Sequence, residues 1–512
     1  MNLKINLQTL NQLTIIYVSV PLLVFLATWL KPYIALISFI LFVYAIYCGY
    51  FKNKNFVCKN LLNNRTVFIM LIVISVLWCY FSGIGGFWYQ SFDHNWRNAI
   101  FRDLINYDWP VHYKNLNVTL VYYVGFWLPS ALIVKIISLF CHFSNHLLFF
   151  IGNEMLFVYG AIGLFLVFVN ILFALKIKKH NRALLAMFIF VLFSGMDIVG
   201  ALFPFFYDTS FVFKQLHLEW WSYIGQYSSN TTVLFWVFNQ GIPAWLIVLM
   251  FYNNRKKIEN YGILALLCFF CAPLPFIGMA VLLISYFIKN LFSEYKKNKI
   301  SEYVKKIFSV QNIVSIIFIT PIIFLYFVSS VTAVTGGGSG GTGHYRALWG
   351  FWTIACMFVY FIFLEACAYL IPIYKQYKST FIYYVVFIYL FMCPIVMTGK
   401  KVDFCMRTTI PMFIILVLLI MRFLFRKYNF KKYKIRYLFL CLCLILGSIT
   451  PIFEFTRGIK GVITNKTVFE SADGLRSLEN IISYDQYGNV RSGNFVAEFP
   501  KEKTFFKYLA RK

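Results

Sequence analysis

Long apolar segments separated by short polar ones recur along almost the whole chain. Most are close to the roughly 17–25 residues that a transmembrane helix needs, and roughly fourteen have helix length. An outer-membrane barrel would show short segments of alternating hydrophobicity instead. The pattern predicts an all-α polytopic membrane protein, a bundle of about 13 transmembrane helices with large outer loops and a short polar C-terminal tail.

The distribution of lysine and arginine predicts which loops face the cytoplasm. These residues gather in short loops such as KIKKHNR, NNRKK and RKYNFKKYKIR. The positive-inside rule places such loops, and with them the N-terminus, in the cytoplasm. We therefore expect outer loops at residues 85–117, 205–231 and 332–348. Residues 453–512 follow as an extracytoplasmic tail of the membrane domain, residues 1–452, and the expected location is the plasma membrane.

The predicted number of membrane crossings conflicts with the predicted sides of the two termini. An inside N-terminus and an outside C-terminus require an odd number of crossings, whereas the apolar segments number roughly fourteen. The surplus lies between residues 117 and 176, where one segment carries Pro129 and Lys135. Either this segment is re-entrant, or the loop KIKKHNR faces outside against the charge rule. The sequence leaves both interpretations open.

Composition supports a membrane protein and excludes other classes. The chain is 60% hydrophobic and only 13% charged, whereas a soluble domain has about 25% charged residues. The net charge of +28 does not indicate nucleic-acid binding, because the basic residues fall in short loops between apolar segments. Cys268 and Cys271 have CxxC spacing but no histidine nearby, so we interpret them as buried thiols and predict no metal site.

Carboxylates cluster in the predicted outer segments, and the loop QSFDHNWRNAIFRDLINYDWP is the richest of them. Its spacing predicts a short amphipathic helix at the membrane interface, with Asp93 at the N-cap position. Two roles are open for Asp93. It caps the helix, or it acts as a base whose environment His94 and Arg97 set.

Asp197 is a second candidate base at the outer end of an apolar segment. Gly195 and Gly200 flank it, which predicts a close approach of the backbone to another group. A carboxylate in that position needs a partner or water, so an ordinary hydrated helix end is the alternative.

Three further outer segments carry candidate binding residues. The loop HLEWWSYIGQYSSNTTVLFWVFNQ resembles a carbohydrate-contacting surface, although an aromatic belt at the interface is equally consistent. The glycine-rich loop is a lid or a linker and not a P-loop. An arginine in DFCMRTTIP suits a phosphate, with headgroup contact as the alternative. The candidates are Glu219, Trp220, Tyr227, Asn239, Gln240, His344, Arg346, Asp403 and Arg407.

The order of these segments resembles the glycosyltransferase C superfamily, multi-spanning enzymes that take sugar from a polyprenyl-phosphate carrier. The resemblance rests on DHNWRNAIFRDL, YYVGFWLPSALIVK, FSGMD, SSNTTVLFWVFNQ and DFCMRTTIP and covers residues 85–411, with a tail ending FFKYLA. It implies that Asp93, in the first outer loop, is the catalytic base. The sequence departs from the family in having two spans before that loop, and in the pair Asp93–His94 where many relatives have paired acids, so a divalent metal is not indicated.

The expected function is transfer of a sugar, with inversion, from a polyprenyl-phosphate donor to a cell-envelope acceptor on the outer face. Such a reaction needs one base for the acceptor hydroxyl and cations for the departing phosphate, here Arg407 with Arg346 or Lys401. The donor is a co-substrate and no cofactor is expected; the acceptor is a glycan, lipid or protein. A polymerase joining lipid-linked repeat units is the second interpretation, and a flippase for lipid-linked sugars is the third.

Overall fold

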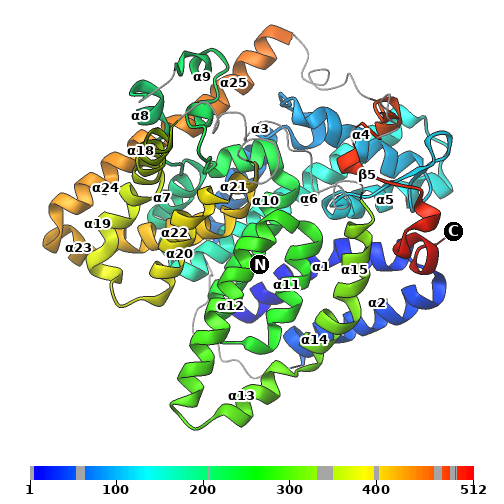
Figure 1. Ribbon diagram of the computed structural model, residues 1–512, viewed down its shortest axis with the longest axis horizontal. Helices are drawn as coiled ribbons and strands as arrows, with labels where there is room; N and C mark the ends of the chain where they lie inside the picture. The colour runs from blue at the N-terminus through cyan, green and yellow to red at the C-terminus, as the bar shows by residue number, and fades with distance from the viewer. Residues whose placement is uncertain are drawn as a thin grey trace.

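The computed structural model describes residues 5–52, 64–204, 208–330, 350–396, 403–465, 476–484, 490–491 and 493–511. Within these residues the chain is almost entirely helical, and a few short strands gather at one end of the bundle (Figure 1). The predicted all-α fold is therefore confirmed.

Eight helical segments in the described part of the chain are long and apolar enough to cross a membrane. They are α1 (Leu7–Trp29), α2 with η1 (Pro32–Phe51), α6 (Asn145–Leu175), α10 (Asn230–Asn254), α12 (Pro273–Tyr295), α14 to α15 (Val310–Val328), α18 to α19 (Phe351–Tyr377) and α24 to α25 (Lys434–Thr464). Six shorter apolar segments accompany them: α3 (Arg65–Phe81), α5 (Leu128–Phe140), α7 (His180–Val191), η6 to α11 (Ile258–Cys271), α20 to η9 (Phe381–Ile395) and α22 (Ile410–Leu424).

Helix α10 forms the centre of the bundle. It contacts α6, α11, α22, α1 and α25, and nearly all of its residues are buried, as expected for a helix that is apolar on every face. The helix is kinked at Val237, where φ is −138° and ψ is 38°. Pro243 follows six residues later; a proline inside a helix removes a hydrogen bond and crowds the carbonyl of the preceding turn. The kink reorients the residues from Phe238 to Gln240.

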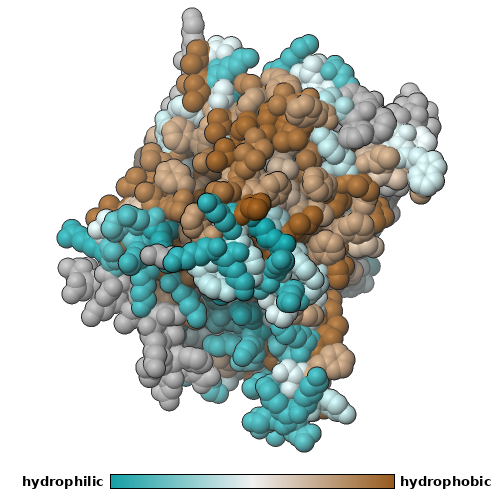
Figure 2. All heavy atoms as spheres, turned by 90° about the vertical axis from the view of Figure 1, so that its left-hand side faces the viewer, coloured by the Kyte–Doolittle hydropathy of each residue, from teal (hydrophilic) through white to brown (hydrophobic). Residues whose placement is uncertain are grey.

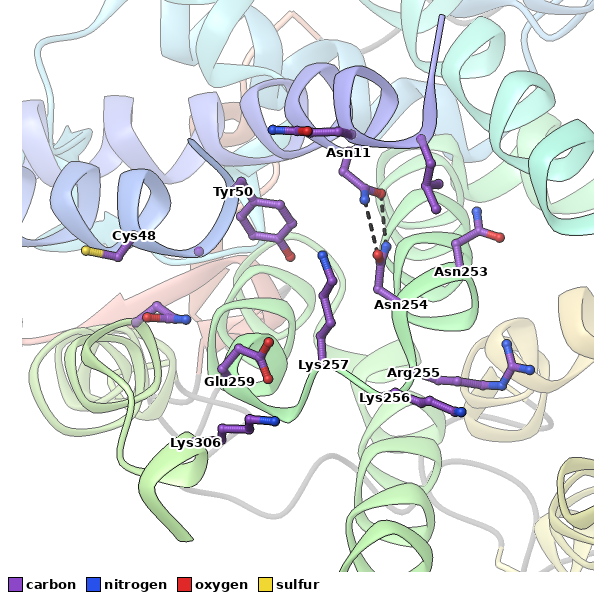
Figure 3. Close-up of a pocket in the computed structure, with 14 residues that line it drawn as sticks. Asn11, Cys48, Tyr50, Asn253, Asn254, Arg255, Lys256, Lys257, Glu259 and Lys306 are labelled. Atoms are coloured by element: carbon purple, nitrogen blue, oxygen red, sulfur yellow. Dashed lines mark hydrogen bonds between the residues drawn. The ribbon is translucent and has the colours of Figure 1, made fainter. Parts of the chain in front are cut away.

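The surface carries a broad apolar band, with hydrophilic side chains gathered toward the side of α13 (Ile300–Ile307) (Figure 2). We call this side the basic end, defined by Arg255, Lys256, Lys257 and Lys306. These cations and Glu259 line a cavity of about 530 Å³ (Figure 3). Beside the cavity, the side-chain amides of Asn11 and Asn254 are joined by two hydrogen bonds, of 3.1 and 2.9 Å.

The opposite end, which we call the α4 end, carries α4 (Asp93–Asn106) and the strands. Three helices, α1, α2 and α3, precede α4; the first two are long enough to cross a membrane, and α3 is one of the shorter apolar helices. The remaining short helices are α8 (Asp197–Leu202), α9 (Ser210–Lys214), α21 (Asp403–Thr408) and α23 (Lys427–Lys432).

Helix α5 begins and ends at the α4 end. A Cβ on Gly125, just before it, would lie 3.4 Å from the Sγ atom of Cys271 at the end of α11. Lys135, in its middle, donates a 2.7 Å hydrogen bond to the carbonyl oxygen of Tyr107. The next helix, α6, begins with Asn145, which lines the same cavity as Asn98 and Arg102 of α4, so α5 also ends there. The segment with Pro129 and Lys135 therefore does not cross the bundle.

The C-terminal tail is part of the sheet at the α4 end. Strand β5 (Val496–Glu498) pairs antiparallel with β2 (Val118–Leu120), which pairs with β1 (His112–Tyr113). Strands β3 (Ser483–Tyr484) and β4 (Val490–Arg491) form a separate pair. The predicted boundary between residues 452 and 453 lies inside α25 (Ile449–Asn465), and the tail beyond this helix packs on the first loop instead of forming a separate appendage.

Asp103 fastens the tail to α4. Its Oδ2 atom accepts a 2.6 Å hydrogen bond from the hydroxyl of Tyr113 and a 3.0 Å bond from the backbone N–H of Leu478. Burial raises the pKa of Asp103 to about 6, although both donors act in the opposite direction. The neighbouring Glu479 accepts a 2.6 Å bond from Tyr107, so the tail contacts the loop at two points.

Candidate active site

Asp93 is the first residue of α4 and does not cap it. The N-cap is Phe92, and no side chain closes the first turn. The predicted capping role of Asp93 is therefore wrong. Its Oδ2 atom instead lies 3.2 Å from Nη2 of Arg97, one turn along the helix. The Asp93 side chain is 36% exposed and that of Arg97 only 8%, so the carboxylate remains accessible while the guanidinium is buried.

Arg407 reaches the same place from the distant helix α21. Its Nη1 atom donates a 2.8 Å hydrogen bond to the hydroxyl oxygen of Tyr123, which also accepts a bond from the hydroxyl of Tyr122. Asp403, one turn earlier, lies 3.8 Å from the guanidinium but is largely exposed. The negative charge of Asp93 raises the pKa of Arg407, and the positive charge of Arg407 lowers that of Arg97, so the three groups lie within electrostatic range of one another. The structure therefore brings Asp93, Arg97 and Arg407 together.

Arg97 and Arg407 are two largely buried guanidinium groups within electrostatic range of each other, and Asp93 and Asp403 offset only part of their charge because both carboxylates are partly or largely exposed. Burial lowers the pKa of Arg97; the negative charge of Asp93 acts in the opposite direction, and the positive charge of Arg407 adds to the lowering. Nη1 of Arg97 and Nε of Arg407 are buried and have no hydrogen-bond partner among the described residues. A buried donor without a partner costs about 1–3 kcal/mol. The arrangement thus favours an anionic ligand, which would use both donors and neutralise the repulsion.

His94 lies beside these residues and is held as a neutral ring. Its Nδ1 atom is 3.1 Å from the hydroxyl of Ser91, and its ring stacks on Phe238 of α10 with centroids 5.8 Å apart. Arg97 lies over the same phenyl ring at 5.6 Å. Burial, and next the charge of Arg97, lower the pKa of His94. Its Nε2 atom is buried without a partner in the described part of the chain, so it remains available to a ligand.

The α10 residues after the kink add two amides. Asn239 and Gln240 directly follow Phe238, the residue that covers Arg97 and His94. Both are buried, and none of their four side-chain polar atoms has a partner among the described residues. Their predicted role in binding stays a prediction, and the unused hydrogen-bonding capacity is consistent with it.

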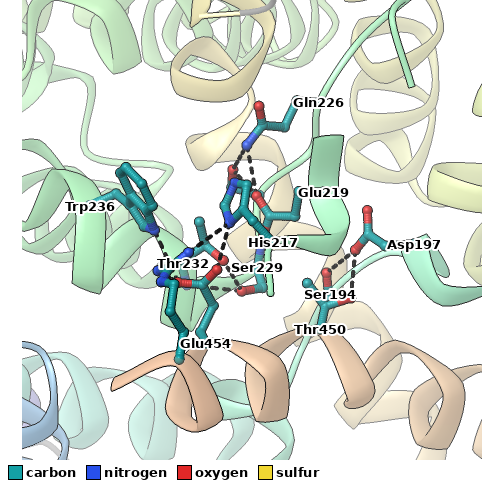
Figure 4. Close-up of polar contacts among 12 residues, drawn as sticks. Ser194, Asp197, His217, Glu219, Gln226, Ser229, Thr232, Trp236, Thr450 and Glu454 are labelled. Atoms are coloured by element: carbon teal, nitrogen blue, oxygen red, sulfur yellow. Dashed lines mark hydrogen bonds and ion pairs between the residues drawn. The ribbon is translucent and has the colours of Figure 1, made fainter. Parts of the chain in front are cut away.

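Asp197 belongs to a different buried cluster (Figure 4). Its carboxylate accepts 2.8 Å bonds from the hydroxyls of Ser194 and Thr450. The indole N–H of Trp221 lies 3.2 Å from Asp197 and 3.2 Å from Glu365. Burial raises the pKa of Asp197. With its oxygens engaged in this way, Asp197 is a weaker candidate base than Asp93.

The close approach predicted at the glycines around Asp197 is present. A Cβ on Gly195 would lie 1.5 Å from Oε2 of Glu365, and one on Gly200 would lie 2.3 Å from the Trp221 ring. Only glycine fits at either position without displacing these groups.

Glu219 positions the start of α10. It accepts bonds from Gln226 at 2.8 Å, from the Ser228 hydroxyl at 2.6 Å and from the backbone N–H of Ser229 at 2.8 Å. Burial, followed by the charge of Asp197, raises the pKa of Glu219 to about 7. Because Ser229 is the N-cap of α10, Glu219 fixes this helix terminus, and its predicted contact with a substrate stays a prediction.

A network that the sequence analysis missed joins this loop to α25. Glu454 accepts hydrogen bonds from Nδ1 of His217 at 2.6 Å and from Nε1 of Trp236 at 3.0 Å, and it also pairs with Arg457 (Figure 4). Trp220 packs edge-on against His217, with ring centroids 4.4 Å apart. The signal for this network was present: Glu454 and Arg457 are three residues apart in an apolar segment, where charged residues are rarely without partners.

Several predicted residues lie elsewhere. Tyr227 is buried among Phe361 and Phe413, and its hydroxyl bonds to the carbonyl oxygen of Leu390; its predicted binding role stays a prediction. Tyr122 and Tyr123, which meet Arg407, were not predicted. His344, Arg346 and Lys401 lie outside the described residues.

No group of three histidine, cysteine, aspartate or glutamate side chains that could hold a metal occurs within the described ranges. Cys268 and Cys271 are buried free thiols. Comparison of the chain with protein-family models, curated proteins and solved structures finds no match.

Proposed function

We propose that the protein transfers a sugar from a polyprenyl-phosphate donor to a cell-envelope acceptor, and that the reaction takes place at the α4 end. The observation that carries the proposal is the convergence of Arg97, Arg407 and Asp93. Two buried guanidinium groups with unpartnered donors favour a phosphate, and a partly exposed carboxylate beside them suits a base. The resemblance to the glycosyltransferase C superfamily points in the same direction.

The reaction follows from this geometry. The donor phosphate lies between Arg97 and Arg407, and it competes with Asp93 for Arg97. The released carboxylate takes the proton of the acceptor hydroxyl as that oxygen attacks the anomeric carbon. The bond from this carbon to the phosphate oxygen breaks, and the departing phosphate takes the electron pair and is stabilised by both guanidinium groups. Direct displacement inverts the anomeric centre.

The proposal places the α4 end outside the cell and the basic end in the cytoplasm, since lysine and arginine favour cytoplasmic loops. With α5 excluded, the crossing segments are the eight long helical segments and five of the six shorter ones, thirteen in all. An odd number agrees with a cytoplasmic N-terminus and an extracytoplasmic C-terminus.

The test is sugar transfer from a panel of radiolabelled polyprenyl-phosphate sugars by purified wild type and Asp93→Asn. Asparagine retains the shape of aspartate but is no base, so we expect transfer to fall by a factor of roughly 10² or more. Asp108→Asn, at an exposed carboxylate of the same loop, is the matched control and should remain active. Equal activity of wild type and Asp93→Asn would contradict the role of Asp93.

Polymerisation of lipid-linked repeat units is the second candidate, because two adjacent guanidinium groups also suit a diphosphate. Activity with a diphosphate-linked oligosaccharide and none with any monophosphate donor would favour it.

A further inference from the structure

Helix α13 joins two of the long apolar segments at the basic end. It lies at the far end of α12, beyond the other helices (Figure 1). Tyr295, the last residue of α12, precedes Ile300 by five positions, and Val310, the first residue of α14, follows Ile307 by three. A helix of eight residues is about 12 Å long. Both ends of α13 are thus tethered to segments that are long enough to cross a membrane, so the helix lies close to the membrane surface.

One flank of α13 is fixed to α12. The Tyr303 ring lies 6.1 Å from that of Phe287, and its hydroxyl donates a 2.9 Å hydrogen bond to the carbonyl oxygen of the same residue. Tyr303 is the one buried residue of α13. This contact therefore sets the orientation of the helix about its own axis.

Three apolar side chains on another side of α13 remain exposed. Ile300, Val304 and Phe308, which directly follows the helix, are 37%, 39% and 67% exposed. Because they are four residues apart, they lie along one side, and we call them the α13 stripe. Single exposed apolar residues are common on any protein, whereas a continuous stripe among the hydrophilic side chains of this end indicates a contact surface (Figure 2).

Lysines surround the α13 stripe. Residues 289–306 contain six lysines and two glutamates, a net charge of +4. One of the glutamates, Glu294, pairs with Lys297 at 2.8 Å. Lys305 is exposed and lies about 100° around the axis from Val304, whereas Glu302 lies on the side opposite the stripe. A cluster of about four to eight basic residues beside a crossing helix, or on an amphipathic helix, is typical of contact with anionic lipid.

The position of α13 and its charge favour lipid over protein as the occupant of the stripe. A lipid leaflet offers acyl chains directly beside phosphates, which matches an apolar stripe flanked by lysines. A helix of this kind buries its apolar side about 5–10 Å into the boundary between headgroups and acyl chains. A second copy of the chain would instead bring the lysines of two such segments against each other, which is unfavourable.

We propose that α13 lies in the plane of the membrane surface and binds anionic phospholipid, with the α13 stripe among the upper acyl chains and the flanking lysines at the phosphates. The leaflet is the one that the basic end faces, which is the cytoplasmic leaflet under the orientation proposed above. This binding is independent of sugar transfer, so Asp93→Asn should leave it unchanged.

The placement of α13 is tested with single cysteines in a variant without native cysteines. Val304→Cys and Glu302→Cys each carry a polarity-sensitive fluorophore, and the protein is placed in lipid nanodiscs that contain phosphatidylglycerol. The probe at residue 304 should be shielded from acrylamide and quenched by lipids brominated on the upper acyl chain. The probe at residue 302, on the opposite side, is the matched control and should remain open to acrylamide. Equal access at the two positions would overturn the placement.

The preference for anionic lipid is tested with the same probe at residue 304. Each lysine near an anionic surface raises membrane affinity about fivefold. Lys305→Gln should therefore lower the ratio of shielded to open probe by about that factor in phosphatidylglycerol, and leave it unchanged in phosphatidylcholine alone. Lys178→Gln, at an exposed cation outside this segment, is the control and should match the unsubstituted protein.

Two outcomes would overturn the anionic lipid. One is a ratio that depends neither on phosphatidylglycerol nor on Lys305. The other is shielding of the residue 304 probe that occurs only after soluble proteins are added, which would assign the α13 stripe to a protein partner.

Discussion

At the α4 end several charged side chains are buried and bonded to one another, whereas at the basic end the cations border an open cavity. Glu454 is 1% exposed and meets His217 and Arg457, while Lys256 and Lys306 are exposed. Burying charges is expensive and requires fixed partners, whereas a lysine at a membrane surface keeps its water. This difference agrees with the proposed function, in which the α4 end carries the chemistry and the basic end faces the cytoplasm.

The largest expected difference between the ends is their accessibility from outside the cell. Lys114 at the α4 end and Lys256 at the basic end are both exposed, so Lys114→Cys and Lys256→Cys are made singly in a variant without its native cysteines. A membrane-impermeant maleimide on intact cells should label the first and not the second until the membrane is permeabilised. The reverse result would place the candidate active site in the cytoplasm.

Stability should depend more on the buried charges of the α4 end than on the neutral hydrogen bonds of the basic end. Glu454→Gln leaves Arg457 and His217 without their carboxylate, and the loss of one partner of a buried pair costs about 3–5 kcal/mol. Asn254→Ala at the basic end removes neutral hydrogen bonds only, with a loss of about 1 kcal/mol. Unfolding in detergent, followed by circular dichroism, measures both. Equal losses of stability in the two variants would contradict the larger contribution assigned to the buried charges.

The attachment of the tail at the α4 end should respond to pH. The pKa of Asp103 in the folded state is about 6, against about 3.9 in an unfolded chain. The folded protein then holds a proton that the unfolded chain has lost, so this contribution is complete below about pH 4 and is lost as the pH rises through 6. The difference between these two pKa values corresponds to roughly 3 kcal/mol in the free energy of unfolding.

Melting temperatures between pH 4.5 and 7.5 test this attachment. Asp103→Asn should remove the corresponding part of the fall in stability, and Asn254→Ala should keep the pH profile of wild type. A wild-type profile in Asp103→Asn would contradict the role assigned to this carboxyl.

The smallest expected effect concerns the form of the phosphate contact. Arg407→Lys keeps the charge but loses the planar fork, so kcat/KM for the polyprenyl-phosphate donor should fall about tenfold. Lys256→Gln at the basic end should leave this value within twofold of wild type, because it lies far from the donor. An active Arg407→Lys variant with unchanged kcat/KM would show that a point charge is sufficient.

The pattern of residues along the chain was enough to predict the helices and some residues of the candidate site. Apolar segments of membrane length predicted the bundle, and the glycines beside Asp197 predicted a close contact. Asp93 and Arg407 were identified as residue types suited to a base and a phosphate ligand. The predicted capping role failed because a side-chain partner decided the outcome: Asp93 pairs with Arg97 instead of capping α4.

The sequence by itself determined the class of fold and the asymmetric distribution of basic residues, because both follow from hydrophobicity and charge along the chain. Only the tertiary structure decided that α5 does not cross and that the tail completes the sheet on the first loop. It also decided that Arg407 lies beside Arg97 and that Glu454 meets His217. These contacts join residues hundreds of positions apart, and it is the packing around the kinked helix α10 that brings them together.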